Sequence, residues 1–293
     1  MTGAPAPTPP RRPPPSRISP EALARQRGGA VEGLAWLGRK PESHGPWQYH
    51  VVRLIARAVC FGLFRFRIST SGREHLPPGG GYMLVGAAHR GWMDPFVVQH
   101  ALPPEPRAWF LGSGPSTFTA RWREVLIRAI GGLLPVWRGG VGLDQHVASA
   151  RAVLGNGGVF VQMPEGTVGG PAGRIGPFRP GWAIIALRTD APIVPLAMAG
   201  TEELYLGRRM ASRILPATTV RELAGLTVDV PFPEPGSRAE LDLARVMTER
   251  LAAVLGPAVE ALHQGTVDSP AHPRLLRRRL TWLLLRPGRL DRD

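Results

Sequence analysis

Cysteine is almost absent from this sequence, and its absence narrows the classes of protein to which the chain can belong. Among 293 residues only Cys60 is a cysteine, so no intrachain disulfide and no cysteine-based zinc site is expected. A chain of this length buries a sizeable core without such cross-links, in one large domain or two small ones. We therefore expect Cys60 to act as a small hydrophobic residue and not as a nucleophile.

Long hydrophobic runs are also missing. No stretch reaches the roughly 18 uncharged apolar residues that a membrane-spanning helix needs. The N-terminal sequence MTGAPAPTPPRRPPPSR has no apolar core behind its arginines, unlike a secretory signal. We expect a cytoplasmic protein that is at most peripheral to a membrane.

Lysine is as scarce as cysteine, since Lys40 is the only one, yet the chain is strongly basic. Its net charge is +14 and its pI is near 11.5. Such a charge implies an anionic partner, which is a nucleic acid, an anionic membrane surface or a phosphorylated substrate. Few aromatic residues lie among the arginines, so a stacking platform for nucleic acid is not expected.

Strand-like apolar runs alternate with helix-like segments along most of the chain. Strands are expected over residues 66–72, 83–88, 107–111, 133–137, 159–163, 193–199 and 226–230. Helices are expected over residues 117–130, 143–154 and 182–188, and a last helix, opened by a capping box of Ser237 and Glu240, runs to about residue 262. This alternation predicts an α/β fold, with a mostly parallel sheet flanked by helices.

The two ends of the chain differ in composition from its middle. Residues 1–20 are rich in proline and predict a disordered tail, and residues 21–70 predict a helical segment. Within that segment, residues 47–66 have a wide apolar face, which fits either a helix packed on the domain or one lying in a membrane interface. Residues 263–293 are basic and leucine-rich, so a membrane anchor and a solvated helix capping the domain are both open.

A histidine and an aspartate follow the expected strand at residues 83–88. The segment AHRGWMDP places His89 at the end of the apolar run and Asp94 directly before a proline. A histidine acts as a general base near neutral pH when a carboxylate fixes its tautomer and stabilises the imidazolium. A strand–turn–helix junction brings the two side chains together. The same residues also fit a simple helix cap at Asp94, so spacing alone leaves both interpretations open.

A second cluster of polar residues follows the expected strand at residues 159–163. Glu165, Gly166 and Thr167 come at the end of this strand, where α/β proteins bind ligands. Pro-Glu-Gly is also ordinary turn sequence. Three arginines have the chemistry of a phosphate clamp, although each alone fits a solvated surface position: Arg138, Arg174 and Arg179.

Several motifs of other enzyme classes are absent from the sequence. It contains no Gly-x-Ser-x-Gly elbow, no Walker-type phosphate loop, no dinucleotide fingerprint after a strand and no His-Glu-x-x-His. No nucleophile is therefore evident. Direct attack by an acceptor hydroxyl, deprotonated by His89, is the simplest use of a His–Asp pair.

Four blocks, in this order, resemble the glycerolipid acyltransferase family typified by 1-acylglycerol-3-phosphate acyltransferases. His89 and Asp94 match its His-x4-Asp block. Its Gly-x-(Ile/Phe)-x-x-(Asp)-Arg block resembles residues 132–138, and its Phe-Pro-Glu-Gly-Thr-Arg block resembles residues 163–168, with Phe-Arg-x-Gly following at 178–181. Its apolar Val-Pro strand is matched at residues 193–197.

This resemblance implies an acyltransferase catalytic domain over residues 71–262. His89 takes the proton from the acceptor hydroxyl, and Asp94 orients and stabilises His89. The headgroup of the acceptor is held, on this resemblance, by Arg138, Glu165, Gly166, Thr167 and Arg179.

The implied reaction moves a fatty acyl group from acyl-CoA or acyl carrier protein to a lysophospholipid such as 1-acylglycerol-3-phosphate, in phospholipid biosynthesis. No metal or redox cofactor is implied. The expected partners are therefore the thioester donor, the lysophospholipid acceptor and an anionic membrane surface. The expected location is peripheral, on the inner face of the cell membrane.

The chain departs from the family pattern at residues beside the matched ones. Ala88 stands for Asn, Gly91 for Ser, Trp137 for an acidic residue and Met163 for Phe. Val168 stands where the family has a phosphate-binding arginine. The alternative is therefore a non-catalytic or differently specific membrane lipid-binding relative, acting on a non-phosphatidic acceptor.

Overall fold

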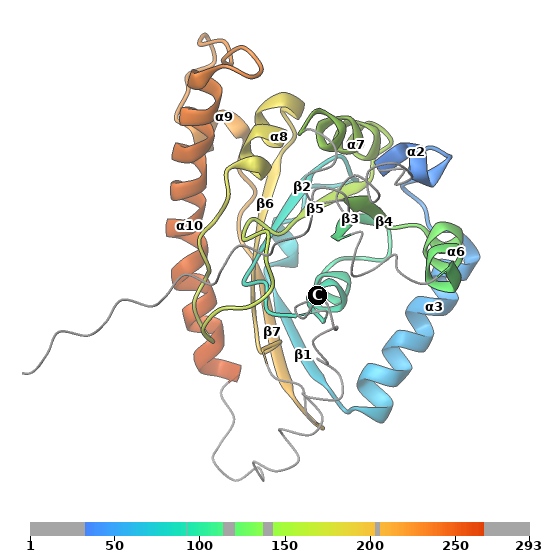
Figure 1. Cartoon of the computed structure of the whole chain (residues 1–293). Coiled ribbons are helices and arrows are strands. Elements are labelled where there is room, and N and C mark those ends of the chain that lie inside the picture. The colour runs from blue at the N-terminus through green and yellow to red at the C-terminus, as the bar shows by residue number, and fades with distance from the viewer. Residues whose placement is uncertain (1–32, 92, 114–120, 137–142, 203–205, 267–293) are drawn as a thin grey trace, which may run out of the picture. The chain divides into compact units, whose positions relative to one another are not determined.

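A single sheet organises the part of the chain that this computed structural model describes, which is residues 33–91, 93–113, 121–136, 143–202 and 206–266 (Figure 1). Seven strands form this sheet within those residues, in the order β1-β7-β6-β2-β5-β3-β4. The strands are β1 (Arg67–Ser71), β2 (Met83–Ala87), β3 (Ala108–Ser113), β4 (Leu133–Val136), β5 (Val159–Gln162), β6 (Ile193–Ala199) and β7 (Arg209–Ile214).

The sheet is mostly parallel, as the sequence predicted. Neighbouring strands pair in parallel throughout, except that β6 pairs with β7 in the antiparallel direction. Strands β2 and β6 lie in the middle, and every residue of both is buried. Burial on both faces explains why these strands are continuous apolar runs in the sequence.

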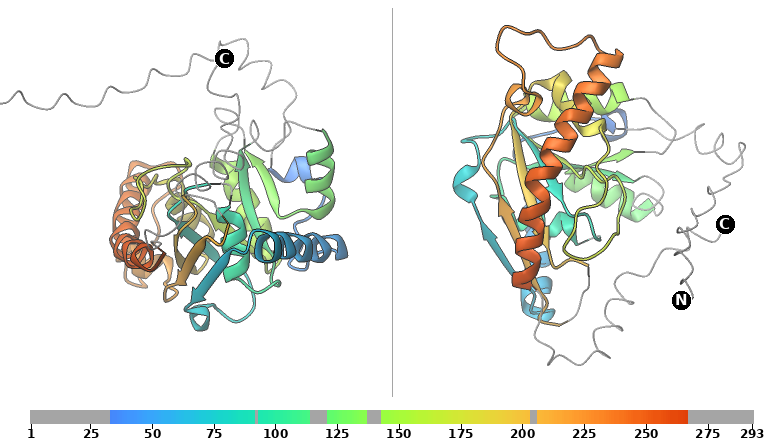
Figure 2. Two further views of the ribbon diagram at one scale, coloured as in Figure 1. Left: turned by 90° about the horizontal axis from the view of Figure 1, so that it is seen from below. Right: turned by 90° about the vertical axis from the view of Figure 1, so that its left-hand side faces the viewer.

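Helices cover both faces of the sheet. The helices are α2 (Gly33–Leu37), α3 (Trp47–Arg57), the π-helix η1 (Ala58–Leu63), the 3-10 helix η2 (Arg73–His75), α4 (Asp94–Ala101), α6 (Arg121–Ile130), α7 (Leu143–Gly155), α8 (Gly181–Thr189), α9 (Val220–Ala224) and α10 (Arg238–Thr266). One apolar cluster joins the sheet to α7, α8 and α10, and a second joins the other face to α4. Figure 2 (left) shows the strands between α10 on one side and α3 on the other. None of the described helices is both long enough and apolar enough to cross a bilayer.

Cys60 packs against the second apolar cluster from η1. Burial raises the pKa of its thiol, which disfavours the reactive thiolate. Its surroundings are therefore those of the small hydrophobic residue that the sequence predicted.

One expected strand in the last third of the sequence is wrong, and one strand of the sheet was not predicted. Residues 226–230 form no strand, and Val228 in this segment is 83% exposed. The backbone carbonyls of Thr227 and Val230 accept hydrogen bonds from the Arg221 side chain, and not from a neighbouring strand. The seventh strand is β7, whose sequence RMASRI lacks a long apolar run. Pairing with β6 on one side and β1 on the other stabilises it.

The capping box expected at the start of α10 forms only in half. The Ser237 hydroxyl accepts the Glu240 backbone N–H at 3.1 Å. The Glu240 carboxylate accepts the Gly236 N–H at 2.7 Å and two N–H groups of Arg188 at 2.7 and 2.8 Å, so it does not close the box on Ser237. It instead connects α10 to α8. A complete capping box lies at Thr219 and Glu222, at the start of α9.

Because Arg188 hydrogen-bonds its carboxylate, Glu240 has a pKa below the ordinary value. A lowered pKa stabilises the fold above the pKa of the unfolded state, about 4.3, and this stabilisation is lost as the pH falls through the folded-state value. Glu240→Gln should lower the free energy of unfolding by about 3 kcal/mol at pH 7. The deficit relative to wild type should shrink below about pH 4. Urea unfolding at both pH values measures it, with the exposed Glu260→Gln on the same helix as control.

Candidate active site

The junction between β2 and α4 brings His89 and Asp94 together. β2 ends at Ala87, His89 follows in the turn, and Asp94 is the first residue of α4. The imidazole Nδ1 lies 2.6 Å from Asp94 Oδ2. The His–Asp contact that the sequence predicted is therefore present.

Asp94 does not cap α4. The residue at the cap position is Met93, and no side chain accepts a hydrogen bond from the first turn of the helix. Asp94 is fully buried, and its Oδ2 points back into the turn, where it accepts the backbone N–H groups of Arg90 at 2.6 Å and Gly91 at 2.9 Å. The turn and the imidazole therefore share one carboxylate oxygen, and the simple capping interpretation is wrong.

This arrangement determines which imidazole nitrogen is available for chemistry. A carboxylate only accepts hydrogen bonds, so Nδ1 of His89 donates its hydrogen to Asp94 and Nε2 carries the lone pair. The His89 side chain is 18% exposed. The site thus directs Nε2 of His89 away from the buried carboxylate, which contacts Nδ1.

The end of β5 holds the backbone of His89 from the other side. Glu165 is buried, and its Oε1 accepts the His89 backbone N–H at 2.9 Å. The His89 carbonyl accepts the N–H of Gly169 at 3.1 Å. Because β2 and β5 are neighbours in the sheet, the turns that follow them meet at this edge.

An arginine that the sequence reasoning did not select completes this contact. Arg90 is buried, and its Nη1 donates to Glu165 Oε2 at 3.1 Å and to the carbonyl of Gly169 at 2.5 Å. A Cβ at Gly170 would lie 2.9 Å from Nη1, so the loop approaches Arg90 closely. The sequence shows that Arg90 directly follows His89, which could have marked Arg90 as a site residue. Nothing in the sequence indicates that Arg90 pairs with Glu165.

The remaining residues expected at the site are more exposed. Gly166 has a φ of 63°, and a Cβ there would lie 3.1 Å from Cδ of Arg179, so a glycine lets that arginine lie against the turn. Thr167 and Arg179 are exposed beside this turn. Arg174 is also exposed, whereas Arg138 lies outside the described residues.

Two features limit what this site can bind. Val168, which replaces the family arginine, is 60% exposed and offers no charge to a phosphate. Within the described part of the chain, no group of three His, Cys, Asp or Glu side chains is arranged to hold a metal ion. The exposed cations of the described loop that follows this turn are Arg174 and Arg179.

Known proteins are similar to the part of the chain that carries this geometry. Residues 67–199 match the family model described as Acyltransferase, from the first residue of β1 to the last residue of β6. The fold is similar to the crystal structure of the 1-acyl-sn-glycerophosphate (LPA) acyltransferase PlsC from Thermotoga maritima, with a TM-score of 0.54 and 18% sequence identity over 75% of this chain and 81% of that chain. No curated protein matches the sequence significantly. Residues 67–199, which include His89, Asp94 and Glu165, are thus similar to the acyltransferase family, in agreement with the motif resemblance to glycerolipid acyltransferases.

Proposed function

We propose that this acyltransferase transfers a fatty acyl group from acyl-CoA or acyl carrier protein to the free hydroxyl of a lysophospholipid such as 1-acylglycerol-3-phosphate. The observation that carries the proposal is the 2.6 Å contact between His89 and the buried Asp94. The product is a diacyl phospholipid, which places the reaction in phospholipid biosynthesis. This reaction needs a base beside an accessible hydroxyl and no enzyme nucleophile.

The proposed chemistry uses the free nitrogen of His89. The acceptor oxygen attacks the thioester carbonyl carbon while Nε2 of His89 takes the hydroxyl proton. The tetrahedral intermediate then collapses, the carbon–sulfur bond breaks, and the imidazolium gives its proton to the leaving sulfur. The products are an ester and a free thiol. The Asp94 carboxylate stabilises the imidazolium throughout.

The headgroup of the acceptor is expected beside the turn at Gly166 and Thr167. Arg179 lies against that turn and is exposed, so it is the side chain we assign to the acceptor's anionic group, together with Arg138. Glu165 is expected to play a different part. Both of its carboxylate oxygens already accept hydrogen bonds from the protein, and a carboxylate would repel a phosphate.

The second candidate function is that of a lipid-binding relative with another acceptor. The exposed Val168 favours it, because an arginine at this position would supply the charge that a phosphate acceptor requires. The intact contact of His89 with Asp94 favours catalysis instead. The two functions therefore differ in whether the protein catalyses acyl transfer and in whether the acceptor must carry a phosphate.

Helix α3 supports the proposed attachment to a membrane. On one side, Arg53 donates to the carbonyls of Gln99 and Leu102, which fixes α3 to the end of α4. The other side, together with the neighbouring helix α6, exposes a set of large apolar side chains that we name the apolar face: Trp47, Val51, Leu54, Ile55, Val125 and Leu126. Packing on the domain therefore holds for one side of α3, and a membrane interface is our proposal for the other side.

The apolar face is the surface we assign to the bilayer. Single exposed apolar side chains are common on proteins, but a contiguous group on two adjacent helices marks an interaction site. An anionic membrane surface would also attract the strongly basic chain. The enzyme would then act as a peripheral protein on the inner face of the cell membrane. The basic residues at 267–293 lie outside the described residues, so an anchor there stays a prediction.

His89→Ala should lower kcat for acyl transfer by about 10² to 10⁴-fold, because the acceptor hydroxyl then loses its base. The assay follows thiol release and ester formation, with matched acceptors that carry or lack a phosphate. The exposed His44→Ala serves as control and should retain full activity. Equal rates for wild type and His89→Ala would rule out the dyad, and turnover only with the phosphate-free acceptor would favour the second candidate function.

Arg90→Met should lower kcat by roughly 10 to 100-fold without changing KM, since Arg90 and Glu165 hold His89 from behind and a small displacement of His89 slows the reaction. The matched control is Arg188→Met, which breaks another Arg–Glu pair, between α8 and α10. If Arg188→Met loses as much thermal stability as Arg90→Met does, its kcat should still equal that of wild type. Equal loss of kcat in both variants would mean that Arg90 acts only through stability.

Replacing Trp47 and Leu54 by glutamine should weaken binding to anionic vesicles by roughly tenfold or more, because about 2 kcal/mol of transfer free energy is lost for each large apolar side chain. Vesicle sedimentation measures the binding. The control replaces Val228 and Val254, which are exposed elsewhere, by glutamine and should bind as wild type. If the Trp47 and Leu54 variant binds as tightly as the control, the apolar face is not the membrane contact.

A further inference from the structure

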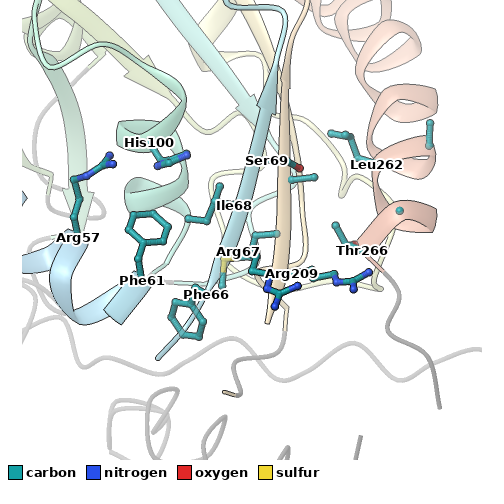
Figure 3. Close-up of a pocket in the computed structure, with 14 residues that line it drawn as sticks. Arg57, Phe61, Phe66, Arg67, Ile68, Ser69, His100, Arg209, Leu262 and Thr266 are labelled. Atoms are coloured by element: carbon teal, nitrogen blue, oxygen red, sulfur yellow. The ribbon is translucent and has the colours of Figure 1, made fainter. Parts of the chain in front are cut away.

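A cavity of about 630 Å³ lies at the outer edge of β1, and no residue of the candidate active site lines it (Figure 3). β1 is an edge strand of the described sheet, since it pairs only with β7. Arg57 and His100 line the cavity on one side of β1, and Leu262 and Thr266 line it on the other. Its volume lies within the range of about 300 to 1,000 Å³ that small-molecule sites occupy.

The charged side chains in this lining are all cationic. Arg57, Arg67 and Arg209 line the cavity, together with His100 and without any aspartate or glutamate. Arg67 and Arg209 are direct partners in the parallel register of β1 and β7, so they lie side by side. In the described part of the chain, neither forms an ion pair with a carboxylate. Like charges directly opposite in a sheet are destabilising, and a bound anion would remove the repulsion.

The positive charges around the cavity also affect the pKa of His100. Its pKa is lowered by burial and then by the charges of Arg57, Arg73 and Arg53. Its Nδ1 is buried and has no hydrogen-bond partner in the described residues. The cavity therefore combines arginines that form no ion pair in the described residues with an imidazole whose ring is hydrogen-bonded to the Ile68 backbone but whose Nδ1 has no partner there.

The rest of the lining is apolar. Aromatic and aliphatic side chains from η1, from the residue before β1, and from β1, β7 and α10 form most of its wall: Phe61, Phe66, Ile68, Met210 and Leu262. A small phosphate or a nucleic-acid backbone would leave this wall uncovered. An anionic headgroup with an attached hydrocarbon chain fits both parts, with its charge on the arginines and its chain on the apolar wall.

The position of the cavity also fits a lipid. Arg57 is the last residue of α3, and Phe61 lies in the adjoining η1. Helix α3 carries most of the apolar face that we assign to the bilayer. We propose that this cavity binds one anionic phospholipid from the membrane, at a site separate from the acceptor site. Binding at this site rests on contact with a membrane and requires no acyl transfer.

The test uses dihexanoyl phosphatidic acid below its micelle concentration, with binding to the full chain measured by titration calorimetry. With excess lysophosphatidate present to fill the acceptor site, one equivalent should bind to wild type. Arg67→Gln with Arg209→Gln should weaken the affinity at least tenfold, as expected when two charge-assisted contacts are lost. The control pair, Arg238→Gln with Arg245→Gln on α10, removes the same charge from exposed positions and should bind as wild type.

Two further arms decide between the possible ligands. Glycerol 3-phosphate and dihexanoyl phosphatidylcholine should each bind at least tenfold more weakly than dihexanoyl phosphatidic acid, because one lacks the chains and the other lacks the net charge. Equal affinity of the Arg67/Arg209 variant and the control pair, or of the two dihexanoyl lipids, would overturn the proposal.

The last arm separates this site from the acceptor site. His89→Ala should bind dihexanoyl phosphatidic acid as wild type does, and a lysophosphatidate acceptor should not displace the lipid one for one. One-for-one displacement would identify the cavity as the acceptor site and contradict a second site. Absence of acyl transfer by wild type would refute the proposed function without affecting this binding result.

Discussion

The hydrogen bonds made by one carboxylate oxygen, Oδ2 of Asp94, are the interaction on which the candidate site depends. This atom accepts Nδ1–H of His89 and the backbone N–H groups of Arg90 and Gly91. It therefore determines both the conformation of the turn and the tautomer of the imidazole. Because Asp94 is the first residue of α4, the orientation of the helix against the sheet sets the position of the base.

The sheet supplies the second constraint. β2 and β5 are parallel neighbours, so the turns that carry His89 and Glu165 leave the sheet at the same edge. The buried pair of Arg90 and Glu165 connects the two turns. A buried ion pair is costly to desolvate and adds little net stability. Its value here is geometric, since Glu165 holds the backbone of His89 while Asp94 holds its side chain. The membrane contact and the lipid site are both proposals, and they involve other elements, α3 and the β1 edge, than those that hold His89.

Much of this arrangement was predictable from sequence, for identifiable reasons. Strands β2 and β6 are buried on both faces, so each appears as an uninterrupted apolar run. His89 and Asp94 are five residues apart, so their contact depends on local structure alone. β7 was not predicted, because strand pairing stabilises a sequence with two arginines and little apolar character. The role of Glu240 was only half predicted, because its main partner, Arg188, lies on another helix. Arg90 was missed for the same reason, since its pairing with Glu165 depends on the packing of the sheet.

The central claim is that the negative charge of Asp94 enables His89 to accept the proton of the acceptor hydroxyl. Asp94→Asn tests it most directly, because the amide oxygen can still accept the hydrogen bonds that Oδ2 receives while the charge is removed. The rate of acyl transfer by this variant should be compared with wild type at equal folded fraction. A decrease in kcat of about 10²-fold or more is predicted, since the imidazolium is no longer stabilised. An unchanged kcat would contradict a catalytic role for the pair.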